Sequence, residues 1–375
     1  MKRIVFALLA AALVLGCSSK KSVGNTVYVF GPTPDHGWTG SAARFAEEKI
    51  GQLNAAGGKY TYVFRSAGSP DQQIQQIEAM LAESKLPAGV VIQASDNMVQ
   101  AAVEQIAEAG IPLILFDRLL DGTSPLIREK MLIAMSADNY AIGAGAAYYM
   151  VEKGLTPGEA IWELPGDNSA VSVERGNGFR EFLTGARPFN DDQGQAHTIA
   201  ADKKWTDAQL GSIVSSQVAD WSRDNAKQYF ESYITGKTNA TMAKWLWTMD
   251  DEFVMGILEL LQTPAKAAEN AVFESSVKVL TGCGGLIALY DVMGRTKASA
   301  GNQLYQPDGM SIMSPTCRPG FFVDAIQFMA DYLGGADLSV HYTEAASKRF
   351  HEPPHLVDTA SWAANKNNPS WRGFD

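Results

Sequence analysis

Short apolar runs alternate with segments of helical periodicity along the first third of the chain. The runs lie at Thr26–Phe30, Tyr60–Arg65, Gly89–Gln93 and Ile111–Arg118. Between them, apolar residues recur at helical spacing in Ser41–Asn54, Ser69–Ser84 and Met98–Ala109. Runs that are apolar on both faces are typical of buried parallel strands with helices on either side. This alternation predicts an α/β fold with a doubly wound parallel sheet.

The same pattern returns in the second part of the chain. After Met131–Met135, which we interpret as a strand leaving the first sheet, strands are predicted at Glu159–Leu164, Ile213–Gln217, Trp245–Thr248 and Val277–Thr281. Helices are predicted at Asn139–Gly154, Ser172–Thr184, Asp224–Thr235 and Phe253–Leu261. An irregular stretch, Gly185–Leu210, indicates an insertion. A second α/β sheet of the same style is therefore expected.

The last part of the chain suggests a return to the first sheet. A short strand at Met310–Met313 is followed by a helix at Gly320–Leu333 and by one more strand at Pro354–Asp358. We therefore predict an N-terminal α/β lobe of residues 26–135 plus 315–340, and a C-terminal α/β lobe of residues 136–314 plus 341–375. Several chain crossings would form a hinge, with a site for ligand between the lobes.

The N-terminus resembles an export signal. Lys2 and Arg3 precede an apolar stretch, Ile4–Leu15, that is too short to span a bilayer. It ends in Val-Leu-Gly-Cys17, which resembles a bacterial lipobox, so residues 1–16 are expected to be a signal peptide and Cys17 to be lipidated. The alternative is an ordinary secretory signal with an incidental cysteine. Residues 17–25 then form a polar tether.

Composition excludes several kinds of partner. The 375 residues are enough for two domains, and the formal charge of −10 becomes −12 once Lys2 and Arg3 are removed with the signal. An acidic chain argues against nucleic acid and against a polybasic attachment to anionic lipid. Two further cysteines, Cys283 and Cys317, are expected to be buried free thiols, although export permits a disulfide.

Chemically active side chains collect where the predicted strands end. They are Asp35, His36, Trp38, Asp96, Phe116, Asp117, Arg118, Asn168, Arg175, Trp221, Asp250, Asp251, Cys283 and Ser314. Ligands of open α/β sheets bind beyond these carboxyl ends. Carboxylates and guanidinium groups pair with hydroxyls, and flat rings stack on the C–H faces of sugars. The set therefore predicts sugar recognition. Simpler roles are the alternatives: Asp117 and Arg118 would form an ion pair, and Asp250 would cap a helix.

Four motifs resemble the type I periplasmic binding proteins of the ribose and galactose cluster. They are Ile-Pro-Leu-Ile-Leu-Phe-Asp-Arg ending at Arg118, Arg-Gly-Asn-Gly-Phe beginning at Arg175, Gln-Val-Ala-Asp-Trp-Ser-Arg around Trp221, and Met-Asp-Asp-Glu-Phe-Val-Met-Gly around Asp250. The resemblance covers about residues 26–333. It implies that Asp117, Arg118, Arg175, Trp221 and Asp250 bind a sugar or polyol, with Asp35, His36 and Trp38 in the first lobe, Cys283 in the second and Ser314 at the hinge.

Some residues depart from the family's pattern. Cys283 stands where many relatives carry an Asp, Ser314 where a Gln is common, and Asp250 where an Asn is usual. The segment Asp35-His36-Gly37-Trp38 also differs from that of ribose binders. These differences put ribose in doubt as the ligand more than they put the family in doubt.

The resemblance implies a monomeric lipoprotein, outside the cytoplasm, that delivers its ligand to the permease of an ABC importer. A sensory binding protein for a chemoreceptor or kinase remains an alternative. A sugar-processing enzyme is the other, but no nucleophile elbow, Walker loop, His-Glu-x-x-His or metal-spaced Cys/His cluster occurs. No catalytic residue, cofactor or metal site is predicted.

Overall fold

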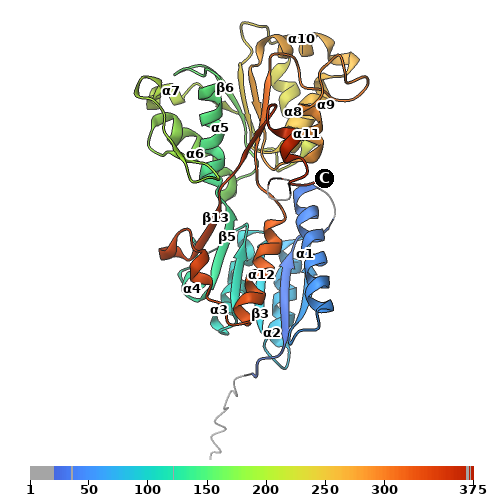
Figure 1. The fold of residues 1–375 in the computed structure, drawn as a ribbon, viewed down its shortest axis with the longest axis vertical. Helices are drawn as coiled ribbons and strands as arrows, with labels where there is room; N and C mark the ends of the chain where they lie inside the picture. Colours follow the sequence, from blue (N-terminus) through green and yellow to red (C-terminus); the bar gives the residue numbers. More distant parts are fainter. Residues whose placement is uncertain (1–20, 35–36, 121, 369–370, 372) are drawn as a thin grey trace, which may run out of the picture.

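Two six-stranded sheets organise the chain into two lobes, one above the other in Figure 1. This computed structural model describes residues 21–34, 37–120, 122–368, 371 and 373–375. Buried apolar clusters lie on both faces of each sheet, as expected for sheets covered by helices on two sides. The predicted fold class, two doubly wound α/β lobes, is confirmed. Among the described helices none has the length and apolar character needed to cross a bilayer.

The first lobe has the strand order β13-β5-β4-β3-β1-β2, with every neighbouring pair parallel. Its strands are β1 (Thr26–Gly31), β2 (Thr61–Ser66), β3 (Gly89–Ile92), β4 (Leu113–Phe116), β5 (Ile133–Ala137) and β13 (Arg349–Glu352). Its helices are α1 (Gly37–Ala55), α2 (Pro70–Ala82), α3 (Gln100–Glu108), α4 (Pro125–Lys130) and α12 (Phe321–Leu333), with short 3₁₀ turns at Asn97–Val99, Leu338–His341 and Ala345–Ser347.

The second lobe has the order β14-β12-β11-β10-β6-β9, in which only β14 is antiparallel to its neighbour. Its strands are β6 (Ile161–Leu164), β9 (Ile213–Ser215), β10 (Trp245–Thr248), β11 (Val279–Thr281), β12 (Ser311–Pro315) and β14 (Leu356–Asp358). Its helices are α5 (Asn139–Glu152), α6 (Ala170–Thr184), α7 (Asp207–Leu210), α8 (Arg223–Ile234), α9 (Asp251–Leu261), α10 (Ala267–Ser276), α11 (Ile287–Met293) and α13 (Trp362–Asn365), with 3₁₀ turns at Ala201–Lys203 and Pro264–Lys266.

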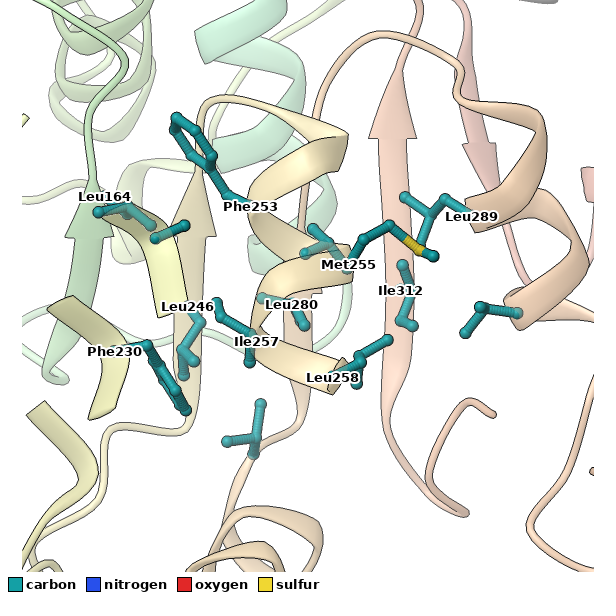
Figure 2. Close-up of a cluster of buried hydrophobic side chains, with 14 of the residues drawn as sticks. Leu164, Phe230, Leu246, Phe253, Met255, Ile257, Leu258, Leu280, Leu289 and Ile312 are labelled. Carbon is teal, nitrogen blue, oxygen red and sulfur yellow. The ribbon is translucent and has the colours of Figure 1, made fainter. Parts of the chain in front are cut away.

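The core of the second lobe shows why its helices cover the sheet. Figure 2 shows α9 lying over the sheet, with Ile257 beside Leu246 of β10 and Leu280 of β11. Phe253 lies towards Leu164 of β6, and Leu258 lies towards Ile312 of β12. These side chains are fully buried, and burying one large aliphatic or aromatic side chain contributes about 1.5–3 kcal/mol. The apolar residues of α9 therefore fix the start of this helix, and the carboxylates beside it, at the edge of the sheet.

The chain passes between the lobes at three places, after β5, after β12 and after β13. All three passages leave from the carboxyl ends of strands that pair in parallel with a neighbour. The carboxyl ends of both sheets therefore face the hinge, so loops that follow strands in one lobe lie opposite those of the other. This arrangement places one site between the two lobes.

One predicted boundary is wrong. Residues 341–352 were assigned to the C-terminal lobe, but β13 pairs with β5 at the edge of the first sheet, where Phe350 packs against Phe321 and Phe328. The Tyr342 hydroxyl also donates to the Leu132 carbonyl at 2.7 Å. The strand Arg-Phe-His-Glu carries a single apolar residue, so its sequence lacks the pattern that marks a strand.

The predicted insertion forms a small hairpin on the second lobe. Strands β7 (Phe189–Asn190) and β8 (Ala196–His197) pair antiparallel, and Phe189 is buried against α5. At the turn, Asp192 contacts the His355 ring, with 3.0 Å between Oδ2 and Nδ1. The hairpin is thus attached to the third passage of the chain between the lobes.

Candidate functional site

A cavity of about 650 Å³ lies between the carboxyl ends of the two sheets. Residues of both lobes line it. From the predicted set they are Trp38, Asp117 and Arg118 of the first lobe, and Arg175, Trp221, Asp250 and Cys283 of the second. The structure therefore brings together side chains that lie up to 245 positions apart in the sequence.

Asp117 and Arg118 follow β4 directly and are half-buried. The Gln93 side chain, at the end of neighbouring β3, donates to Asp117 Oδ2 at 2.7 Å. Arg118 donates through Nη1 to the Ser95 carbonyl, and no ion pair joins these two described residues, Arg118 and Asp117. The structure therefore does not have the ion pair between these two residues that the simpler interpretation predicts. Neighbouring strand ends instead hold both side chains against the cavity.

Trp38, in the first turn of α1, supplies a flat aromatic surface. Its ring lies parallel to Phe116 at 6.3 Å and 9°, and Phe116 in turn stacks on Phe322 at 4.6 Å. The indole Nε1 donates to the carbonyl of Cys317, in the second passage between the lobes, at 2.5 Å. The Trp38 ring thus packs against Phe116, and the indole also forms part of the cavity wall.

Arg175, near the start of α6, is only 5% exposed. Its Nε donates to Asn139 Oδ1 at 3.1 Å, and its Nη1 donates to the Met249 carbonyl at 2.6 Å. The guanidinium lies 5.4 Å from the centre of the Trp221 ring, close enough for a cation–π contact. No described residue accepts a hydrogen bond from Nη2. A buried guanidinium is thus held rigidly with donor capacity left for a ligand.

Strained backbone marks two loops of the cavity. Asp117, Asp220 and Trp221 have positive φ angles of 62°, 50° and 57°, and all three line the cavity. This region is uncommon for any residue other than glycine and costs about 1–3 kcal/mol per residue. Such strain persists where the surroundings hold the backbone in place, and it clusters at binding sites. The Trp221 ring lies near both the Arg175 guanidinium and the Phe253 ring.

Asp250 serves both of the roles considered for it. Its Oδ1 accepts from the Glu252 backbone N–H at 2.8 Å, which caps α9, and the residue also lines the cavity. Burial raises the pKa of Asp250 well above its ordinary value, against the lowering effect of the Glu252 N–H and of Arg175. When protonated, this carboxyl group can both donate and accept a hydrogen bond, as a sugar hydroxyl requires.

Asp251, the next residue, is fully buried and turned away from the cavity. Its Oδ2 accepts from the Gly285 and Leu286 backbone N–H groups at 2.7 and 2.8 Å and from the Ser314 hydroxyl at 2.8 Å. Its Oδ1 has no hydrogen-bond partner among the described residues. Burial raises the pKa of this carboxyl group to about 6, in spite of the three donors. Asp251 therefore positions the loop after β11, and it also takes the Ser314 hydroxyl out of reach of the cavity.

Asp251 gives a pH dependence whose sign can be derived. An unfolded Asp has a pKa near 3.9, so the folded state keeps this proton to higher pH. This group therefore makes the protein most stable below about pH 4, and that stability is lost as the pH rises to about 6, by roughly 3 kcal/mol at most. Chemical denaturation at pH 5 and pH 7.5 should show greater stability of the ligand-free protein at pH 5. The Asp251→Asn variant should reduce this difference, and an identical difference in the variant would contradict the assignment.

Cys283 and Cys317 are both buried free thiols, and both line the cavity. Burial raises the pKa of Cys283 well above its ordinary value, and a hydrogen bond with Cys317 raises it further. With Ala137 and Ile142 they form a small apolar cluster under Trp38. Cys283 thus contributes a neutral, weakly polar surface at the position where the resembled family often carries a carboxylate.

Among the described residues, five of the predicted set do not line the cavity: Asp96, Phe116, Asn168, Asp251 and Ser314. Asp35 and His36 lie outside the described residues, as does Cys17. Ser314 is fully buried and bonded to Asp251. Within the described part of the chain, His, Cys, Asp and Glu do not gather in threes in a way that would hold a metal ion.

Several lining residues were not predicted. Among them are Ser169, Val171, Asp220, Asp224, Glu252, Phe374 and Asp375. Asp220 immediately precedes Trp221 in the same motif, so that motif contained a signal for it. Nothing in the sequence marks Phe374 or Asp375, because they follow no predicted strand.

Two α/β lobes with a polar and aromatic cavity at their hinge define a two-lobed ligand-binding protein. The chain belongs to the periplasmic binding protein domain family, whose model matches residues 27–298. The lobes have the type I architecture of that family.

Three similar proteins are distant from this chain in sequence. The galactofuranose-binding protein YtfQ of Escherichia coli (strain K12) is 22% identical over 209 residues, or 55% of each chain, so the match spans about half of that curated relative. A solute binding protein from Mycobacterium smegmatis with bound glycerol has a TM-score of 0.64 at 17% identity, covering 93% of this chain and 99% of that one. One from Actinobacillus succinogenes 130z with bound D-allose has a TM-score of 0.63 at 16% identity, covering 90% and 99%. At such identities the likeness shows the fold.

Proposed function

We propose that this protein captures a sugar or sugar-like polyol between its two lobes and delivers it to an ABC importer. The observation that carries the proposal is that Asp117 and Arg118 of one lobe share a cavity with Arg175, Trp221 and Asp250 of the other. Hydroxyl groups pair with carboxylates and guanidinium groups, and the C–H faces of sugars stack on indole rings. The names of the relatives, which include galactofuranose and D-allose, support this ligand class.

Capture would follow from the division of the site. A ligand bound to the first lobe alone meets Asp117, Arg118 and Trp38, and only closure of the lobes adds Arg175 and Trp221. Ligand therefore shifts the population towards the closed form, because that form makes more contacts with it. The three passages between the lobes are the hinge for this movement.

The proposal includes export and attachment. The lipobox-like N-terminus would leave Cys17 as the lipidated first residue of a monomer outside the cytoplasm, with the membrane contacted through lipid alone. The ABC permease is the proposed partner. Cell fractionation tests the anchor: Cys17→Ser should move the protein from the membrane to the soluble fraction, and an unchanged distribution would remove the lipoprotein proposal.

A thermal-shift screen tests the ligand class. The full chain as the cell processes it would be heated with pentoses, hexoses, polyols and nucleosides. A ligand present at about a thousand times its Kd should stabilise the protein by about 4 kcal/mol. We expect this from at least one sugar or polyol. If none of them raises the melting temperature, the proposed ligand class is wrong.

A further inference from the structure

The C-terminal segment, Trp371 together with Gly373–Asp375, is attached to the second lobe beside the cavity. The Gly373 N–H donates to the Gly285 carbonyl at 2.8 Å, and the Ile287 N–H donates to the Phe374 carbonyl at 2.9 Å. The Tyr290 hydroxyl donates to the Trp371 carbonyl at 3.0 Å. Backbone and side-chain bonds thus hold this segment along the loop that follows β11.

Packing holds the same segment in one position. Phe374 is 1% exposed and belongs to the apolar core of the second lobe. Trp371 stacks on the His355 ring at 4.1 Å and 13°. A Cβ at position 373 would lie 1.9 Å from the Gly284 carbonyl oxygen, so the close approach to this loop requires glycine. These contacts indicate that the segment is an ordered part of the second lobe.

The segment reaches the ligand cavity itself. Phe374 and Asp375 line it together with Cys283 and Gly284 of the adjacent loop, and with Trp38 and Thr39 at the start of α1. Figure 1 shows the C-terminus between the two lobes, next to the upper end of α1. Asp375 is therefore a carboxylate at the cavity edge where Cys283 offers none.

We propose that Phe374 and Asp375 are ligand contacts, so that the C-terminal segment forms a third wall of the site. The inference rests on the proposed function and narrows its ligand class. The wall carries Asp117, Asp220, Asp224 and Asp375 against the guanidinium groups of Arg118 and Arg175, because the third lining arginine, Arg223, is paired with Glu252 and Glu259. This excess of carboxylates favours uncharged polyhydroxylated ligands over sugar acids, whose own carboxylates it repels. Asp375 accepts hydrogen bonds from ligand hydroxyls, and Phe374 adds apolar surface beside it.

The test measures Kd by calorimetry on the full-length chain, with the neutral sugar that stabilises it most and with the corresponding uronic acid. Asp375→Asn should weaken binding of the neutral sugar by about tenfold or more, because it removes a charge-assisted hydrogen bond. The matched control is Asp308→Asn, an exposed residue of the second lobe outside the cavity, which should leave Kd within about twofold. The wild type should bind the uronic acid at least about tenfold more weakly than the neutral sugar, and Asp375→Asn should narrow that gap.

A second variant keeps the test decisive. Phe374→Leu retains an apolar side chain in the core and removes the ring from the cavity, so it should weaken binding while leaving the ligand-free melting temperature within a few degrees. If wild type binds a neutral sugar and neither variant changes its Kd beyond twofold, the inference fails and the proposed function stands. Tighter binding of the uronic acid than of the neutral sugar overturns the ligand class. If wild type binds no sugar or polyol, the proposed function fails, and this inference fails with it.

Discussion

Replacing Arg118 with alanine is expected to abolish ligand binding while leaving the ligand-free protein folded. The side chain lines the cavity and makes one hydrogen bond to the described part of the protein, with the Ser95 carbonyl. It is half-buried and has no ion-pair partner there, so its loss should change the free energy of unfolding by no more than about 1.5 kcal/mol. Each charge-assisted bond to a ligand hydroxyl contributes about 1.5–3 kcal/mol. Loss of two such bonds would weaken binding by about a hundredfold or more.

Thermal shift and calorimetry on the same samples separate the two effects. The matched control is Arg65→Ala, an exposed arginine on β2 of the same lobe, outside the cavity. The control should keep both the ligand-induced shift and the ligand-free melting temperature. A large fall in the ligand-free melting temperature of Arg118→Ala would instead assign this arginine a structural role, and unchanged affinity would exclude it from the site.

Periodicity along the chain was sufficient to predict both sheets. Long apolar strands such as Ile111–Arg118 can be predicted from their sequence because both of their faces are buried. Helices with clear apolar spacing can be predicted because one of their faces is buried. The strand β13 has no such pattern. It is a four-residue edge strand with three polar side chains, and only its pairing with β5 places it in the first lobe. That pairing is a tertiary contact, which no local pattern encodes.

The candidate site also contains some residues that the sequence predicts and others that it does not. Asp117, Arg118, Arg175, Trp221 and Asp250 were predicted because each lies near a strand end or a helix start and within a motif that resembles the family. The strand order brings these positions to the edge of each sheet that faces the hinge, and the motifs single them out among other residues at that edge.

Other positions depend on which neighbour a side chain meets. Ser314 also ends a strand, but its hydroxyl donates to a buried carboxylate, Asp251, and so points away from the cavity. Phe374 and Asp375 reach the cavity only because their segment binds the loop at Gly285. Both positions depend on contacts between residues far apart in the sequence. No motif at Ser314, Phe374 or Asp375 predicts these contacts.

The contact between α5 and α6 supports the site from behind, and Gly143→Ala should disrupt it. A Cβ at position 143 would lie 1.9 Å from the Arg175 carbonyl oxygen and 2.8 Å from the Phe179 nitrogen, both backbone atoms of α6. Gly178 of α6 makes the reciprocal approach, 2.1 Å from the Tyr140 carbonyl oxygen. Backbone atoms cannot rotate aside as a flexible side chain does, so the two helices must separate by more than an ångström. Overpacking of this kind costs about 1–3 kcal/mol, and sometimes more.

The same displacement would reach the ligand, because Arg175 lies on the part of α6 that is pushed away. Its bonds to Asn139 on α5 and to the Met249 carbonyl would lengthen together, and a binding group displaced by more than about 0.5 Å loses its productive geometry. We therefore expect Gly143→Ala to lower the free energy of unfolding and also to weaken ligand binding by about tenfold or more. Arg118→Ala, by contrast, should affect binding alone.

Denaturant unfolding and calorimetry measure both effects, and Gly51→Ala is the matched control. Gly51 is an exposed residue within α1, with no atom within 4 Å of the added Cβ. The same substitution there should stabilise the protein by about 0.5–1 kcal/mol, since alanine is the better helix former. Opposite signs in the two variants would show that close helix packing, rather than helix propensity, requires Gly143. If Gly143→Ala is as stable as the wild type and binds equally well, the packing of α5 on α6 does not position Arg175.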